Sequence, residues 1–191
     1  MSDAEAFAVL LLRLVIGATM AVHGLNHWRG GGRIAGTAGW FESLGLRNGR
    51  LQAWMSVITE IGAGVLLAAG FLTPLACAAV ISVMLVAGLL AHRANGFFVF
   101  KDGYEYVLVL GVSCLALAVI GPGPWSLDEA FGIEVTGWAG GAVALGVGVA
   151  ATGGLLATFW RPEKPKQPTS PETPEIPAMP GKPEPQTSEQ A

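Results

Sequence analysis

The sequence predicts an all-α membrane protein: a four-helix transmembrane bundle, a fifth C-terminal transmembrane helix and a disordered Pro-rich tail. Only 13% of the 191 residues are charged and 52% are hydrophobic, whereas a soluble domain carries about 25% charged residues. Long apolar segments recur along the chain, and a helix needs about 20 such residues to cross roughly 30 Å of hydrocarbon. From residue 161 onward the chain is rich in Pro, Glu, Lys, Ser and Thr, a composition that cannot bury a core.

Five apolar segments are long enough to be transmembrane helices: residues 6–22, 53–69, 74–91, 104–121 and 138–159. The first is not expected to be a cleaved signal peptide, because it begins with acidic residues and Arg13 interrupts it. We therefore expect a four-helix domain over residues 1–136, an additional helix over 137–160 and a disordered tail over 161–191.

Short signals define the connections between these helices. Residues 70–73 form a tight turn, after which Thr73 is expected to cap the third helix and Pro74 to occupy its first turn, where no amide donor is needed. Between the first two spans, Ile34, Ala38 and Phe41 recur at a helical spacing. We expect a short amphipathic helix there, lying at the membrane surface.

The fifth span carries no ionisable residue. Its small residues recur every four positions, at Ala142, Gly146, Ala150 and Gly154. Such a stripe lets another helix approach closely. We therefore expect this helix to act in packing, including oligomerisation.

Basic residues fall on one side of the predicted membrane. With five spans, the N-terminus, residues 70–73 and residues 122–137 share one side and contain no Lys or Arg. Ten of the eleven Lys and Arg residues lie on the other side, and Arg13 is the remaining one. The positive-inside rule then places the N-terminus outside and the C-terminal tail in the cytoplasm.

Four spans bring an ionisable group to the membrane: Arg13, Glu60, His92 and Glu105. Such groups are site candidates, because an unpaired charge at the bilayer centre costs about 2.5–3.5 kcal/mol. Long side chains on neighbouring helices make Arg13 and Glu60 the expected ion pair. Glu60, His92 and Glu105 fall with His23 toward the cytoplasmic half, so we expect one shared pocket there. The alternative is that Arg13–Glu60 and His92–Glu105 are structural pairs that fix the bundle.

A quinone head group suits such a pocket. It needs hydrogen-bond donors for two carbonyl oxygens, a proton route and an apolar or aromatic wall. Histidine and a desolvated glutamate suit the proton steps, which makes Glu60, His92 and Glu105 the catalytic candidates. Tyr104 and Tyr106 flank Glu105 and would supply donors, although only one of them shares its helix face. The cofactor that these residues favour is therefore a quinone.

Metal and haem sites are weaker interpretations of the histidines. His23 and His27 are four positions apart and would share a helix face, as two ligands of a metal do. Haem ligation would require His23 and His92 to face each other across the bundle. Nothing beyond residue type marks either site, so histidines that bond to water or backbone are favoured. Cys77 and Cys114 are interpreted as small apolar residues, and their pairing stays open.

Several motifs, in their order and spacing, resemble the DoxX family of membrane proteins. They are LLLRLVIGATMAVHGLNHW at 10–28, FESLGL at 41–46, TEIGAGVLLAAGFLTPLA at 59–76, HRANGFF at 92–98, GYEYVLVL at 103–110 and GPGPWSLDEA at 121–130. The resemblance covers residues 7 to 131 and implies a four-helix membrane bundle, so the fifth helix and the tail depart from the family pattern. It implies polar family positions at Arg13, His23, Glu60, His92, Asn95 and Glu105.

The family resemblance implies a subunit of a quinone-linked or thiol and oxidative-stress redox system in a bacterial plasma membrane. Arg13, His23, Asn95, Tyr104 and Tyr106 would then contribute to binding the cofactor. The alternative is a non-catalytic scaffold or accessory subunit of a larger respiratory or oxidoreductase complex, an alternative that the fifth helix and the tail motivate. The expected partners are the lipid bilayer and other redox proteins, and we expect no nucleic-acid partner.

Overall fold

Each of the five apolar segments forms a helix in the computed structural model, which describes residues 1–133 and 135–162. The long helices are α1 (Asp3–Arg29), α3 (Gly49–Ala69), α4 (Thr73–Ala87), α5 (Glu105–Ile120) and α7 (Gly137–Phe159), and the short ones are α2 (Arg33–Ser43) and α6 (Leu127–Phe131). The chain is an all-α membrane protein, as its composition predicts. The predicted disordered tail, beyond its first two residues, lies outside the described part of the chain.

The third span is longer than α4 alone. The chain continues beyond Ala87 through a π-helical turn (Gly88–His92) and a 3-10 turn (Arg93–Asn95). With this extension it is one of four helical segments long and apolar enough to cross a membrane, the others being α1, α3 and α7. The fifth apolar helix, α5, is shorter, with 16 residues. A second 3-10 turn, Val99–Lys101, precedes it.

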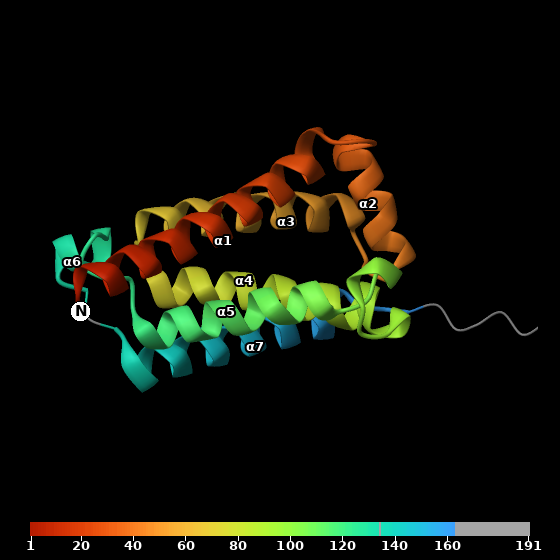
Figure 1. Cartoon of the computed structure of the whole chain (residues 1–191). Coiled ribbons are helices and arrows are strands. Elements are labelled where there is room, and N and C mark those ends of the chain that lie inside the picture. The colour runs from red at the N-terminus through yellow and green to blue at the C-terminus, as the bar shows by residue number, and fades with distance from the viewer. Residues whose placement is uncertain (134, 163–191) are drawn as a thin grey trace, which may run out of the picture.

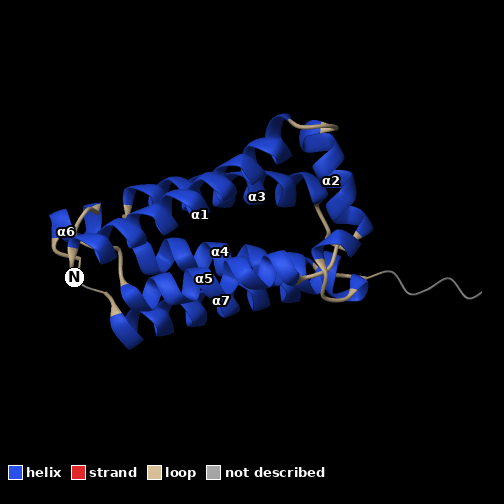
Figure 2. Ribbon diagram, in the orientation of Figure 1, coloured by secondary structure: helices blue, strands red, loops and turns tan. Residues whose placement is uncertain are grey.

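The helices form two groups. α1 packs mainly on α3, while α4 packs on α5 and α7. Contacts between α3 and α4 and between α1 and α5 join the groups. Figures 1 and 2 show that the groups lie close at the end where α6 and the N-terminus are found and diverge toward the end that α2 crosses. We call these the α6 end and the α2 end.

Two glycines allow α1 and α3 to meet backbone to backbone. A Cβ atom on Gly64 would lie 2.5 Å from the carbonyl oxygen of Gly17, and a Cβ atom on Gly17 would lie 2.6 Å from that of Gly64. Any larger residue would force the helices apart. Small residues at helix crossings serve this purpose in membranes, where the lipid is as apolar as the side chains.

The first turn of α4 is capped by a carboxylate of α6 and not, as expected, by Thr73. Asp128 accepts hydrogen bonds from the backbone N–H of Leu72 at 2.7 Å and of Thr73 at 2.9 Å. Thr73 is itself the first helical residue, and Pro74 lies in the first turn as predicted. Leu72 has a left-handed backbone with φ of 49°, which turns its N–H group toward α6. The α6 end is therefore closed by a buried long-range cap.

α7 packs on α4 through a stripe of small residues, but not the predicted one. The buried positions are Gly140, Gly141, Ala144, Gly148 and Thr152. Thr152 Oγ1 lies 3.1 Å from the hydroxyl of Ser82 on α4, which fixes the register of the two helices. Of the predicted stripe, Ala142, Gly146 and Ala150 face outward. The sequence contains two such stripes, and the spacing alone does not show which one is buried.

The end of α7 is joined to the α2–α3 connection. The backbone N–H of Arg47 donates to the Phe159 carbonyl at 2.9 Å, and that of Arg161 donates to the Gly45 carbonyl at 2.7 Å. The Trp160 indole donates to the Leu44 carbonyl at 3.1 Å. The domain boundary at residue 137 stays a prediction, but in space α7 and the four preceding long helices form one bundle.

Candidate functional site

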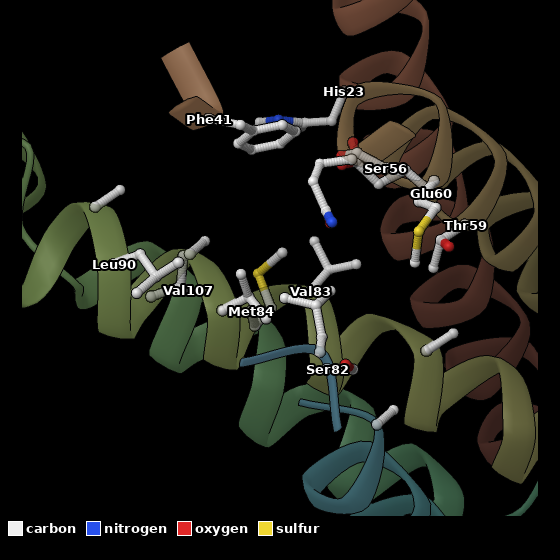
Figure 3. A pocket seen from close by; sticks show the side chains of 18 of the residues that line it. His23, Phe41, Ser56, Thr59, Glu60, Ser82, Val83, Met84, Leu90 and Val107 are labelled. Carbon is white, nitrogen blue, oxygen red and sulfur yellow. The ribbon is translucent and has the colours of Figure 1, made fainter. Parts of the chain in front are cut away.

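A cavity of about 840 Å³ opens between the two helix groups toward the α2 end. Its volume falls within the range of roughly 300–1,000 Å³ that ligand sites occupy. Figure 3 shows that its walls differ in character. The labelled side chains of α1 and α3 are polar: His23, Ser56, Thr59 and Glu60. Those of the facing wall are apolar except for Ser82: Val83 and Met84 of α4, Leu90 of the π-helical turn and Val107 of α5.

Glu60 is the most buried ionisable group in this cavity, with 3% of its surface exposed. The hydroxyl of Ser56, one helical turn earlier on α3, donates to its Oε1 atom. The same oxygen lies 3.7 Å from His27 Nε2. Its other oxygen, Oε2, is buried and has no hydrogen-bond partner among the residues that the structure describes. Buried polar atoms are rarely left unpaired, so this oxygen is a candidate acceptor for a hydrogen bond from a water or a ligand.

Two histidines one turn apart on α1 also line the cavity. His27 is half-buried and stacks against Trp40 of α2, and its Nδ1 atom lies 3.4 Å from the Thr37 hydroxyl. His23 is exposed, and its Nε2 atom lies 3.3 Å from the Tyr106 hydroxyl. Together with Glu60, these side chains form a row of protonatable groups, which we call the polar row: Glu60, His27, His23 and Tyr106.

His92 also lines the cavity, but its partner is not the expected Glu105. His92 Nδ1 lies 2.8 Å from the backbone carbonyl of Asp102 and 3.5 Å from its carboxylate. Glu105 instead accepts a hydrogen bond from the backbone N–H of Val99 at 2.9 Å. Asn95 donates to the Asp102 carbonyl at 3.2 Å. Asn95 and Glu105 thus hold the polar hinge between α4 and α5, and the His92–Glu105 pair is not formed.

Tyr104 and Tyr106 separate as their spacing requires. Tyr106 lines the cavity, whereas Tyr104 is the residue that precedes α5 and packs edge-on against Phe97. Positions two apart along a helix point about 200° apart, toward nearly opposite sides, so only one of the two reaches the site.

Arg13 lies at the α6 end of the bundle and does not line the cavity. It is 1% exposed, and its Nη2 atom donates to the Trp125 carbonyl at 2.6 Å. A Cβ atom on Gly70 would collide with its guanidinium group. Glu60 precedes Gly70 by ten residues on α3, which is roughly 15 Å along the helix. The expected Arg13–Glu60 ion pair is therefore not formed, and the charge near Arg13 is Asp128.

Sequence reasoning missed two contributors to the site. His27 was considered only as a metal ligand, and Ser56 was not considered. Both follow a signal that the sequence holds, because His27 is four residues from His23 and Ser56 is four residues from Glu60, a spacing that places side chains on one helix face. Asp102 and the aromatic residues of α2 carried no such signal. Within the described ranges, no group of three His, Cys, Asp or Glu side chains is arranged to hold a metal ion.

The fold and the cavity define a class: a helical membrane protein with a pocket that has protonatable side chains on one side and a mainly apolar wall on the other. The family model of DoxX matches residues 8–93, so this part of the chain is similar to the DoxX family of membrane proteins. The match includes α1 to α4 and His92, whereas Tyr106, α6 and α7 lie beyond it. No match is found among the curated proteins or among the solved structures.

Proposed function

We propose that this chain is the quinone-binding membrane subunit of a redox system, with the quinone head group beside Glu60. The observation that carries the proposal is Glu60 itself: a buried carboxylate in the lining of the cavity, whose Oε2 atom has no hydrogen-bond partner among the described residues. A quinol offers hydroxyl donors that this oxygen would accept. Bound quinone would supply two-electron, two-proton chemistry, with a partner redox protein supplying or receiving the electrons.

The polar row suits the proton part of that chemistry. Glu60 and His27 approach to 3.7 Å inside the cavity, and His23 meets Tyr106 at its exposed edge. Glutamate and histidine exchange protons readily near neutral pH when their surroundings are apolar. Protons would pass between the cavity and the α2-end surface along these groups. No haem or metal ligation is proposed, because His23 and His92 are engaged with Tyr106 and Asp102.

Charge distribution supports the expected orientation. The described basic residues outside the bundle interior lie in segments at the α2 end: Arg29, Arg33, Arg47, Arg50, Arg93, Lys101 and Arg161. Acidic residues flank the α6 end, with Asp3 and Glu5 in the first turn of α1 and Asp128 and Glu129 in α6. By the positive-inside rule the α2 end is cytoplasmic in a bacterial plasma membrane, and the N-terminus is outside. Quinone would then enter the cavity from the inner leaflet of the membrane.

The test is binding of a tail-less benzoquinol to the purified protein, with Glu60→Ala as the variant. A hydrogen bond to a charged acceptor contributes about 1.5–3 kcal/mol, so quinol affinity is expected to fall roughly 10- to 100-fold. Isothermal titration in detergent measures the dissociation constant. Glu129→Ala removes an exposed carboxylate at the other end and is the matched control, which is expected to bind like the wild type. Absence of quinol binding by the wild type, or equal losses in both variants, would overturn the proposal.

A second candidate function is that of a scaffold subunit which associates through α7. The observation that favours it is the outward-facing stripe Ala142, Gly146 and Ala150, where a Cβ atom on Gly146 would meet nothing within 4 Å. A second copy, or a helix of a partner redox protein, would approach closely there. Deleting α7 cannot separate this role from ligand binding, because α7 also lines the cavity.

Gly146→Leu does separate the two roles. Since Gly146 faces away from the bundle, the variant is expected to keep its fold and its quinol affinity within about twofold, as surface substitutions do. If α7 mediates self-association, the oligomer seen by light scattering in mild detergent should dissociate. An oligomer that survives Gly146→Leu and Gly146→Phe would exclude this helix face as the interface.

A further inference from the structure

The cavity extends away from Glu60 as a groove along one face of α4. Its lining includes Leu75, Ala78, Ala79, Ser82, Val83, Met84, Val86 and Ala87 of α4, and Leu90 and Ala91 of the π-helical turn that continues it. Most of these residues recur every three or four positions, which keeps them on one side of the helix. From Leu75 to Leu90 the groove follows this helical segment for roughly 22 Å at about 1.5 Å per residue. Apart from Ser82 this lining is apolar, in contrast to the polar row at the α2 end.

The groove has α3 and α7 as its walls. Both helices pack on α4, and residues of all three helices line the cavity. The lining residues at the rim are open to the surroundings, with Met55 38%, Leu75 47% and Val147 46% exposed. A Cβ atom on Gly154 would meet nothing within 4 Å. In a bilayer, this side of the cavity therefore opens sideways to the lipid.

We propose that the groove between α3 and α7 holds the apolar tail of a long-tailed quinone whose head lies beside Glu60. This inference rests on the proposed function and names the ligand class: an isoprenoid quinone, in preference to a water-soluble one. The groove is continuous with the pocket that Glu60 lines, and the Oε2 atom of this residue has no partner in the part of the chain that the structure describes. One molecule with a hydrogen-bonding head and a long apolar tail satisfies both parts, and a bare quinone ring fills only the first.

The α7 wall gives this helix a role in ligand selection. On α7, the small residues that line the groove are Ala151 and Gly154, and side chains of this size leave the groove wide. α7 lies beyond residues 8–93, the part of the chain that the family model matches. One wall of the tail groove thus comes from a helix outside the matched region, whereas α3 and α4, which complete the groove, lie within it.

The experiment fills the groove with Ala151→Phe and measures two ligands in the same nanodiscs: a tail-less benzoquinol and a quinol with a long isoprenoid tail. A phenylalanine at this position would occupy space that the tail needs. We expect this overpacking to lower the affinity for the long-tailed quinol about tenfold. The affinity for the tail-less quinol is expected to stay within about twofold. Ala157→Phe, at an exposed position of α7 outside the cavity lining, is the matched control. Ala151→Leu gives a smaller change if the phenylalanine variant fails to fold.

The outcomes distinguish the groove from the head site. If the tail-less quinol binds in a Glu60-dependent way and Ala151→Phe leaves the long-tailed quinol unaffected, the groove inference is overturned and the proposed function stands. Equal losses for both quinols would likewise overturn it. If Ala151→Phe releases a co-purified phospholipid without weakening the long-tailed quinol, a phospholipid occupies the groove instead. If the wild type binds neither quinol, the proposed function itself fails.

Discussion

Gly64→Leu is expected to prevent the bundle from forming, with a loss of more than about 3 kcal/mol in the free energy of unfolding. A Cβ atom at this position would lie 2.5 Å from the Gly17 carbonyl oxygen and 2.9 Å from the backbone nitrogen of Ala21. Overpacking against movable side chains already costs about 1–3 kcal/mol. Here the obstacle is the backbone of α1, which cannot rotate away, so α1 and α3 must separate. Size-exclusion chromatography and thermal melting in detergent measure the loss.

Gly62→Leu provides the control for this prediction. Gly62 lies half a turn away on α3, and a Cβ atom there would meet nothing within 4 Å. The change in side chain and in helix propensity is identical, so any difference between the variants reports the α1–α3 contact. We expect Gly62→Leu to melt within a few degrees of the wild type. Equal behaviour of the two variants would mean that the close α1–α3 approach does not stabilise the fold.

The second large effect is expected for Asp128→Ala, which should lower the free energy of unfolding by about 3–5 kcal/mol. The substitution removes both hydrogen bonds that cap α4, to the N–H groups of Leu72 and Thr73, and bonds to a charged acceptor contribute about 1.5–3 kcal/mol each. It also leaves the buried Arg13 without the opposite charge nearby. Removing one member of a buried charge pair typically costs about 3–5 kcal/mol.

Two further variants test this prediction: one is a control, and the other tests the contribution of Arg13. Glu129→Ala removes the exposed neighbouring carboxylate and is expected to change stability by less than about 0.5 kcal/mol. The double variant Asp128→Ala with Arg13→Met should recover part of the loss, because it removes the charge that the single variant leaves buried. A double variant less stable than Asp128→Ala alone would show that Arg13 stabilises the α6 end through Trp125 and not through Asp128.

Hydropathy and residue spacing were sufficient to predict the helices and the approximate positions of two polar side chains along them. The five spans, the amphipathic helix between the first two, and the position of His23 and Glu60 toward one end all follow from local patterns. Local patterns succeed here because a membrane helix must be apolar over its whole length and must satisfy its own backbone hydrogen bonds. The partners of the ionisable groups could not be predicted in the same way.

Arg13 shows why pairing was harder to predict. The Arg13 side chain is long enough to reach several helices. Which partner it meets depends on how far α1 is shifted along α3. The close contact of Gly17 and Gly64 sets that shift and carries Arg13 to the turn after α3, beside Gly70 and Trp125. Asp128 likewise caps a helix that begins 55 residues earlier in the chain. Contacts of this kind depend on the packed arrangement, which no local pattern contains.

The bonds between the end of α7 and the α2–α3 connection have a consequence for biogenesis. Leu44 and Trp160 are 116 positions apart, and α2 contributes Trp40 and Phe41 to the cavity wall. The ribosome completes the early helices long before Trp160 emerges. The Leu44 carbonyl can therefore accept its hydrogen bond from the Trp160 indole only after α7 has been synthesised. The cavity, which α7 also lines, is consequently complete only after this helix has been synthesised and inserted.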